Sequence, residues 1–193
     1  MEHQPDNNES MRKCFERYQH DFKIPTEDLK TKSLLDVATN TGEFVRYIRT
    51  QLGNREAFAL DKQENRVPED RPEWYVVGNG TDIPFADESF ELITAHNYIP
   101  MFVEEMVKNN NIHHITHMLK KLKVGGSFYF DCFTGDDLRE YDEISGYTHT
   151  PDEQKQEAQI RDKFVKMVFD LKENFTIENW KVGEGTSWKI TKK

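Results

Sequence analysis

The chain lacks the features that mark exported, disulfide-bonded and membrane proteins. Its 193 residues include only two cysteines, Cys14 and Cys132, which cannot supply a disulfide framework. No apolar run is long enough to cross a membrane, and no charged-then-apolar leader opens the sequence. We therefore predict a cytoplasmic protein in a reducing compartment, with no membrane partner.

Hydrophobic and basic residues are also scarce. Hydrophobic residues make up 36% of the chain and the mean hydropathy is -0.84, which predicts a small core under a heavily charged surface. The formal net charge of -9 disfavours a nucleic-acid partner without excluding one, because phosphate binding needs a positive face. Lys120, Lys121 and Lys123 are the one obvious basic cluster before the C-terminus, and we interpret them as a solvated helix end.

Glycine is sparse where a nucleotide-binding turn would need it. Residues 33–37 form an apolar run that includes Asp36, and an amphipathic helix follows from Phe44 until Gly53 stops it. A strand, a tight turn and a helix in this order are typical of the first unit of a nucleotide-binding α/β fold. Ala38, Asn40 and Gly42 occupy the glycine positions of a dinucleotide fingerprint, so a nicotinamide-dependent dehydrogenase is a distant alternative.

A second acid ends the next predicted strand, residues 57–61. Asp61 lies 25 positions after Asp36, about where such folds place a carboxylate on ribose hydroxyls. Two acids at two successive strand ends strengthen the prediction of a nucleotide site.

Four motifs in chain order resemble those of class I S-adenosylmethionine-dependent methyltransferases. Residues 36–42 (DVATNTG) are similar to the family's D-x-G-x-G-x-G, and Asp61 matches its ribose-binding acid. Residues 78–93 (GNGTDIPFADESFELI) resemble G-D-A-x-x-L-P-F-x-D-x-S-F-D, and residues 120–126 (KKLKVGG) resemble R-x-L-K-P-G-G. The resemblance spans residues 33–130.

The resemblance implies a fold, a cofactor and a set of residues. The fold would be a Rossmann-like single domain over residues 1–193, with a seven-stranded, mostly parallel sheet that ends in an antiparallel hairpin. The cofactor would be S-adenosylmethionine. Asp36 would organise the turn, Asp61 would hold the ribose, and Asn79 stands where the family often has Asp. The cofactor-binding residues implied are Asp36, Ala38, Thr39, Asn40, Gly42, Asp61, Lys62, Asn79, Gly80 and Ala95.

The remaining segments complete the predicted domain. We expect residues 1–9 to be disordered and residues 10–32 to form a helical cap with Ser10 as a possible N-cap, either covering the pocket or packing on the sheet. Residues 62–72 and 84–87 are too short for full crossover helices. Gly125 and Gly126 would form a turn before the fifth strand. We interpret residues 132–152 as a long surface loop. We predict a helix that starts at Thr150 and strands over residues 175–182 and 186–191.

Two residues after the fourth strand are candidates for catalysis. His96 could act as a base towards a hydroxyl acceptor and Tyr98 could pack on cofactor or acceptor, or both could be structural residues of the rim. His113 and His117 have the i, i+4 spacing of a metal-binding pair. No acid accompanies them in that helix, so we predict a solvated face and no metal.

The leading hypothesis is a methyltransferase that acts on an unidentified, small-molecule acceptor. A non-catalytic binding or regulatory subunit is the alternative, because two glycines are lost and Asn79 replaces the usual acid. A weaker alternative is an RNA methyltransferase, because residues 122–137 are similar to messenger-RNA cap guanine-N7 methyltransferases. A protein partner or a homodimer is compatible with each.

Overall fold

The computed structural model describes residues 7–70, 72–132, 150–182 and 185–193. A seven-stranded sheet in the order β3-β2-β1-β4-β5-β7-β6 forms the middle layer. The strands are β1 (Leu34–Val37), β2 (Ala57–Asp61), β3 (Tyr75–Val77), β4 (Phe90–Ala95), β5 (Leu122–Cys132), β6 (Phe175–Val182) and β7 (Gly185–Lys192). All pairs from β3 to β5 are parallel, whereas β7 pairs antiparallel with β5 and β6. The predicted Rossmann-like sheet with its closing hairpin is confirmed.

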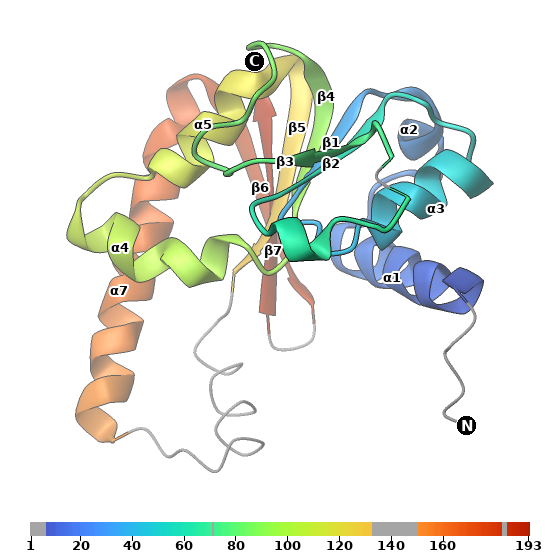
Figure 1. Ribbon diagram of the computed structural model, residues 1–193. Helices are drawn as coiled ribbons and strands as arrows, with labels where there is room; N and C mark the ends of the chain where they lie inside the picture. The colour runs from blue at the N-terminus through green and yellow to red at the C-terminus, as the bar shows by residue number, and fades with distance from the viewer. Residues whose placement is uncertain (1–6, 71, 133–149, 183–184) are drawn as a thin grey trace.

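Helices cover both faces of the sheet (Figure 1). On one side lie α1 (Asn7–Phe22), α2 (Thr26–Thr31) and α3 (Glu43–Gln51). On the other lie α4 (Val103–Lys108), α5 (His113–Lys121) and α7 (Pro151–Phe169). Three one-turn 3-10 helices, η1 (Glu64–Arg66), η2 (Ile99–Phe102) and η3 (Asp170–Glu173), complete the described helices.

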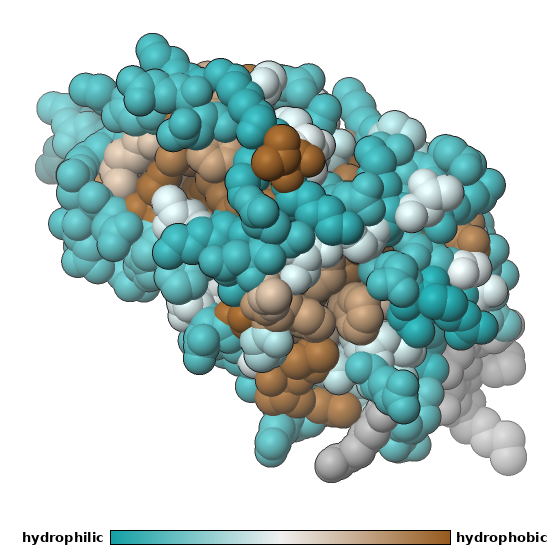
Figure 2. Space-filling model, turned by 90° about the horizontal axis from the view of Figure 1, so that it is seen from above, coloured by the Kyte–Doolittle hydropathy of each residue, from teal (hydrophilic) through white to brown (hydrophobic). Residues whose placement is uncertain are grey.

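Successive residues of the strands point to opposite faces of the sheet and belong to two separate hydrophobic cores. Leu34 of β1 packs with Phe44 and Ile48 of α3, and its neighbour Leu35 packs with Ile115 of α5. All four residues of β1 are buried, as expected of a parallel strand with helices on both faces. Seen from above, hydrophilic residues cover most of the surface, and apolar residues show in patches between them (Figure 2).

The connections beside β3 are short, as predicted. Only η1 stands between β2 and β3, and no described helix lies between β3 and β4. The connections that follow β2 and β3 therefore contain no α-helix in the described chain, and they lie at the carboxyl ends of these strands. This edge is where open parallel sheets bind ligands.

The N-terminal helix begins earlier than predicted. α1 is helical from Asn7, so the expected disorder is wrong for residues 7–9, while residues 1–6 lie outside the described chain. Ser10 lies inside the helix and donates to Glu43 Oε1 at 2.7 Å instead of capping it. Phe15 stacks on Tyr47 of α3 with ring centroids 4.3 Å apart. These contacts with α3 fix the first turns of α1.

Two further expectations concern β5. Gly125 and Gly126 lie within the strand, where Gly125 has φ +79° and the pairing with β4 shifts register between Phe90 and Leu92. The expected glycine turn is therefore an irregularity inside β5. The predicted surface excursion falls mostly on residues 133–149, outside the described residues, and α7 begins at Pro151 as expected. In the described parts of the chain, no helix is long and apolar enough to cross a membrane.

Candidate functional site

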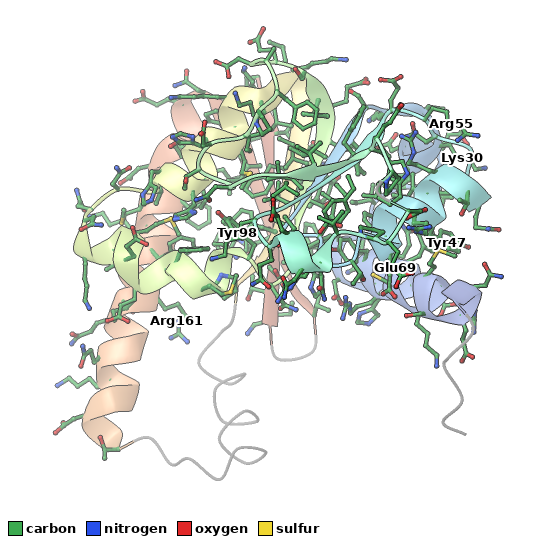
Figure 3. All side chains as sticks on the ribbon, viewed as in Figure 1. Lys30, Tyr47, Arg55, Glu69, Tyr98 and Arg161 are labelled. Carbon is green, nitrogen blue, oxygen red and sulfur yellow. The ribbon has the colours of Figure 1, made fainter. Side chains whose placement is uncertain are left out.

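A cavity of about 580 Å³ opens at the carboxyl ends of the central strands. It brings together six of the residues predicted for the site: Ala38, Asp61, Lys62, Asn79, Gly80 and Tyr98. Tyr98 lies near the centre of the molecule in Figure 3. The other predicted residues do not line this cavity within the part of the chain that the structure describes: Asp36, Thr39, Asn40, Gly42, Ala95 and His96.

The turn after β1 has an unusual backbone conformation although it holds only one of the three motif glycines. Ala38, Asn40 and Gly42 have φ of 58°, 57° and 76°, so all three lie in the left-handed region. This region costs an alanine free energy, whereas Asn and Gly enter it more readily. Two tertiary contacts hold the turn: the Asn40 N–H donates to Asp61 Oδ2 at 2.9 Å, and the Tyr75 hydroxyl donates to the Asn40 carbonyl.

Asp61 lies at the wall of the cavity with a nearly buried carboxylate. Its Oδ1 accepts from the Gln63 N–H at 3.0 Å, and its Oδ2 faces Arg66 Nη1 at 3.8 Å as well as the Asn40 N–H. A carboxylate offers about four lone-pair positions, so these contacts leave capacity to accept from a ligand hydroxyl. Sequence reasoning missed Gln63 and Arg66, because nothing in a polar connecting segment marks them.

Asp36 is fully buried beneath the turn and away from the cavity. Its Oδ1 accepts from the Thr94 hydroxyl at 2.6 Å, and its Oδ2 accepts from the Tyr18 hydroxyl of α1 at 3.3 Å. Burial raises the pKa of Asp36 to about 6, against the opposing effect of these hydrogen bonds. The residue therefore joins β1, β4 and α1.

His96 lies under α1 between two carboxylates. Its Nε2 is 2.7 Å from Asp21 Oδ2 and its Nδ1 is 3.7 Å from Asp131 Oδ2. The ring stacks on Tyr18 with centroids 5.0 Å apart. Burial raises the pKa of Asp131, and the nearby His96 opposes this rise. Both ring nitrogens thus face acids that belong to α1 and β5.

Tyr98 contacts a buried histidine that the sequence analysis did not select. Its hydroxyl is 2.8 Å from His114 Nδ1, and Phe102 stacks on the His114 ring with centroids 3.9 Å apart. Burial raises the pKa of Tyr98 to about 12 and lowers that of His114 to about 4, so both are neutral at neutral pH. His114 precedes Met118 by one helical turn on the buried face of α5, which is the pattern that could have found it.

Gly80 makes room for Tyr98. A Cβ built on Gly80 would lie 2.3 Å from the Tyr98 hydroxyl oxygen, closer than atoms can approach. Beside it, Asn79 Oδ1 accepts from the Thr81 N–H at 3.2 Å. The segment after β3 is therefore packed directly against the η2 side of the cavity.

The comparisons with known proteins agree with this architecture. Residues 35–130 match the sequence model of a methyltransferase domain family. No curated protein sequence matches the chain.

Solved methyltransferase structures share the fold at low sequence identity. A Thermotoga maritima S-adenosylmethionine-dependent methyltransferase, described as a possible histamine N-methyltransferase, is 15% identical with a TM-score of 0.54, over 97% of this chain and 99% of that one. The plantazolicin methyltransferase BpumL, solved with S-adenosylhomocysteine, is 14% identical with a TM-score of 0.60, over 97% and 84%. A Haloferax volcanii methyltransferase–activator complex, formed by Trm112 and a putative methyltransferase, matches at 14% identity and a TM-score of 0.58, over 96% and 94%.

These observations converge on one family. The left-handed turn after β1 and the acid that ends β2 lie inside the matched segment, and the sheet closes with the predicted antiparallel hairpin beyond it. The chain belongs to the class I S-adenosylmethionine-dependent methyltransferases.

Proposed function

We propose that this chain is an active methyltransferase that binds the adenosine part of S-adenosylmethionine in the cavity described above. The observation that carries the proposal is the convergence of Asp61, the turn at Ala38 and the Asn79–Gly80 segment on one cavity. Its volume of about 580 Å³ lies within the range of small-molecule sites. When bound, the cofactor supplies a methyl group on a positively charged sulfur.

The residues that the motifs predicted and that line the cavity each have a proposed role. Asp61 accepts hydrogen bonds from the ribose hydroxyls with the lone pairs left by Asn40 and Gln63. Asn79 and Lys62 flank the adenine. Tyr98, a neutral phenol, forms an apolar wall. Ala38, the residue of the left-handed turn that lines the cavity, lies against the methionine part of the cofactor.

The chain contributes alignment and exclusion of water more than acid–base chemistry. Methyl transfer from a sulfonium needs an in-line approach of the acceptor, which positioning alone favours strongly. Both nitrogens of His96 face carboxylates, so we assign it the positioning of α1 instead of the base role that its sequence position suggested.

We propose a small-molecule or peptide-derived acceptor. BpumL was solved with azole analogues of desmethyl-plantazolicin, and the Thermotoga maritima protein is described as a possible histamine methyltransferase. The net charge of -9 favours such acceptors over nucleic acid. The activator bound to the Haloferax volcanii neighbour supports a protein partner as a further possibility to test.

Calorimetry with S-adenosylmethionine and S-adenosylhomocysteine, beside NAD as a control, tests the proposal. We expect micromolar binding of the first two ligands and none of NAD. Asp61→Asn keeps the shape of the residue, and losing hydrogen bonds to a charged acceptor should weaken binding about 10- to 100-fold. Asp162→Asn on α7 makes the same charge change at an exposed site and should leave binding unchanged.

Transfer of a labelled methyl group to candidate acceptors then separates an enzyme from a non-catalytic subunit. Failure of the folded wild-type protein to bind either adenosyl ligand would reject the proposed cofactor site. Binding without transfer to any acceptor, with and without candidate activator proteins, would support the non-catalytic reading.

A further inference from the structure

The far wall of the cavity carries three side chains that the proposed function does not use. Glu105 comes from α4, and His113 and His114 open α5. All three line the cavity, and one donor atom from each lies within 4.8 Å of the others. We propose that these residues bind a divalent transition-metal ion of the zinc type.

The spacing of one pair already suits a metal. His113 Nε2 lies 3.6 Å from Glu105 Oε1. Ligands in a tetrahedral zinc site, each about 2.1 Å from the ion, lie about 3.4 Å from one another. The three donor atoms lie within 4.8 Å of one another, so the widest pair needs to approach by up to about 1.4 Å. The Glu105 side chain is 52% exposed, so a change of its rotamer can move its carboxylate towards the two histidines.

His114 is held ready for a ligand by its neighbours. The Tyr98 hydroxyl occupies Nδ1 at 2.8 Å, and the Phe102 ring stacks on the imidazole. An oxygen that accepts from one ring N–H of a histidine fixes the tautomer and leaves the second nitrogen for a metal, an arrangement common to protein metal sites. Tyr98 thereby acts as the positioning residue of the proposed site.

The charges near the cluster favour the binding of one cation with moderate affinity. Glu105 supplies the one negative ligand, whereas its neighbour Glu104 is paired with Lys108 at 2.6 Å. The positive end of α5 opposes a cation at His113, and the Glu105 carboxylate offsets it. Two imidazoles and one carboxylate select zinc, cobalt, nickel or copper over magnesium and calcium.

Three protein ligands leave one coordination position open. Because the ligands line the cavity, this position faces the space where a ligand binds. The ion would join α4 to α5 and place a Lewis acid on that wall. His117, which the sequence spacing pairs with His113, lies outside this cluster, and the acid of the cluster comes from α4.

Zinc binding by the untagged, chelator-treated protein tests the proposal without any cofactor. We expect one zinc ion per chain by calorimetry, and the visible absorption of tetrahedral cobalt when Co²⁺ is used as the probe. Glu105→Gln and His113→Ala should each weaken zinc binding at least about tenfold. Tyr98→Phe should weaken zinc binding by a smaller factor, because the His114 ring would lose the hydroxyl that orients it.

Matched controls keep the result interpretable. His117→Ala removes an imidazole one turn further along α5 and should leave zinc affinity unchanged. Magnesium should not bind. Asp61→Asn should retain zinc while losing the adenosyl ligands, so failure of the metal site and failure of the cofactor site are read separately. Absence of zinc binding, or binding unchanged in both Glu105→Gln and His113→Ala, would overturn the proposal.

Discussion

Replacing Asp36 by asparagine should stabilise the protein at neutral pH. The carboxyl group is fully buried, with the Thr94 hydroxyl at 2.6 Å and the Tyr18 hydroxyl at 3.3 Å. Burial raises its pKa from 3.8 to about 6. The folded protein therefore holds this proton more tightly than the unfolded chain does.

The sign of the effect follows from this difference in proton binding. Well below pH 3.8 the carboxyl is protonated in both states, so its ionisation costs no stability. Between the unfolded and folded pKa values, the folded state binds more protons, so stability falls as the pH rises through this window. Above the folded pKa the cost is complete. A rise of about two pKa units corresponds to roughly 3 kcal/mol at pH 7.

Asparagine has the same shape and no charge at any of these pH values. The hydroxyls of Thr94 and Tyr18 can each accept as well as donate, so they can rearrange around an amide. We expect Asp36→Asn to exceed the wild type by about 2–3 kcal/mol in unfolding free energy at pH 7.5, and to approach it near pH 4.

Urea unfolding of both proteins at several pH values from 4 to 8 measures this difference. Asp162→Asn, at an exposed site on α7, is the control, and its unfolding free energy should differ from that of the wild type by an amount that does not change with pH. A difference for Asp36→Asn that does not change with pH, or a variant less stable than the wild type at pH 7.5, would refute the reasoning.

Two further variants test the turn and the histidine beneath α1. Ala38→Gly relieves a left-handed alanine at φ 58° but adds freedom to the unfolded chain, so unfolding free energy measured in urea should rise by up to about 1 kcal/mol; a loss would contradict the strain argument. His96→Ala leaves Asp21 and Asp131 without their shared imidazole and should cost about 3 kcal/mol in the same assay. Because His96 does not line the cavity, its removal should leave the dissociation constant for S-adenosylhomocysteine within about twofold, and a tenfold change would restore a direct role in the site.

Local patterns predicted the sheet because each strand is defined by its own residues. The buried run of β1, the acid that ends β2 and the alternation in β6 and β7 are visible in the sequence and present in the structure. The start of α1 was not predictable in this way. Residues 7–9 are polar, and the helix there is secured by contacts of Ser10 and Phe15 with Glu43 and Tyr47 of a helix distant in the sequence.

In the candidate site, too, some residues could be predicted from the sequence and others could not. Ala38, Asp61 and Asn79 meet because the ends of adjacent parallel strands lie at one edge of the sheet, which topology alone determines. Glu105 and His114 meet because the chain turns back between α4 and α5 over residues 109–112, and no spacing within either helix indicates that they lie together. His96 follows β4, and its contact with Asp21 of α1 could not be predicted from that position because α1 is distant in the sequence.

The turn after β1 remains left-handed at three alternating positions although two of the family's three glycines are replaced. One of these positions holds alanine and another asparagine. Glycine normally makes such a turn possible by removing steric cost, yet here Asp61 binds the Asn40 N–H and Tyr75 binds its carbonyl. These two hydrogen bonds come from β2 and β3, so the sheet itself imposes the conformation. A turn imposed by the sheet is already ordered before any ligand arrives, and the lost glycines are therefore compatible with cofactor binding.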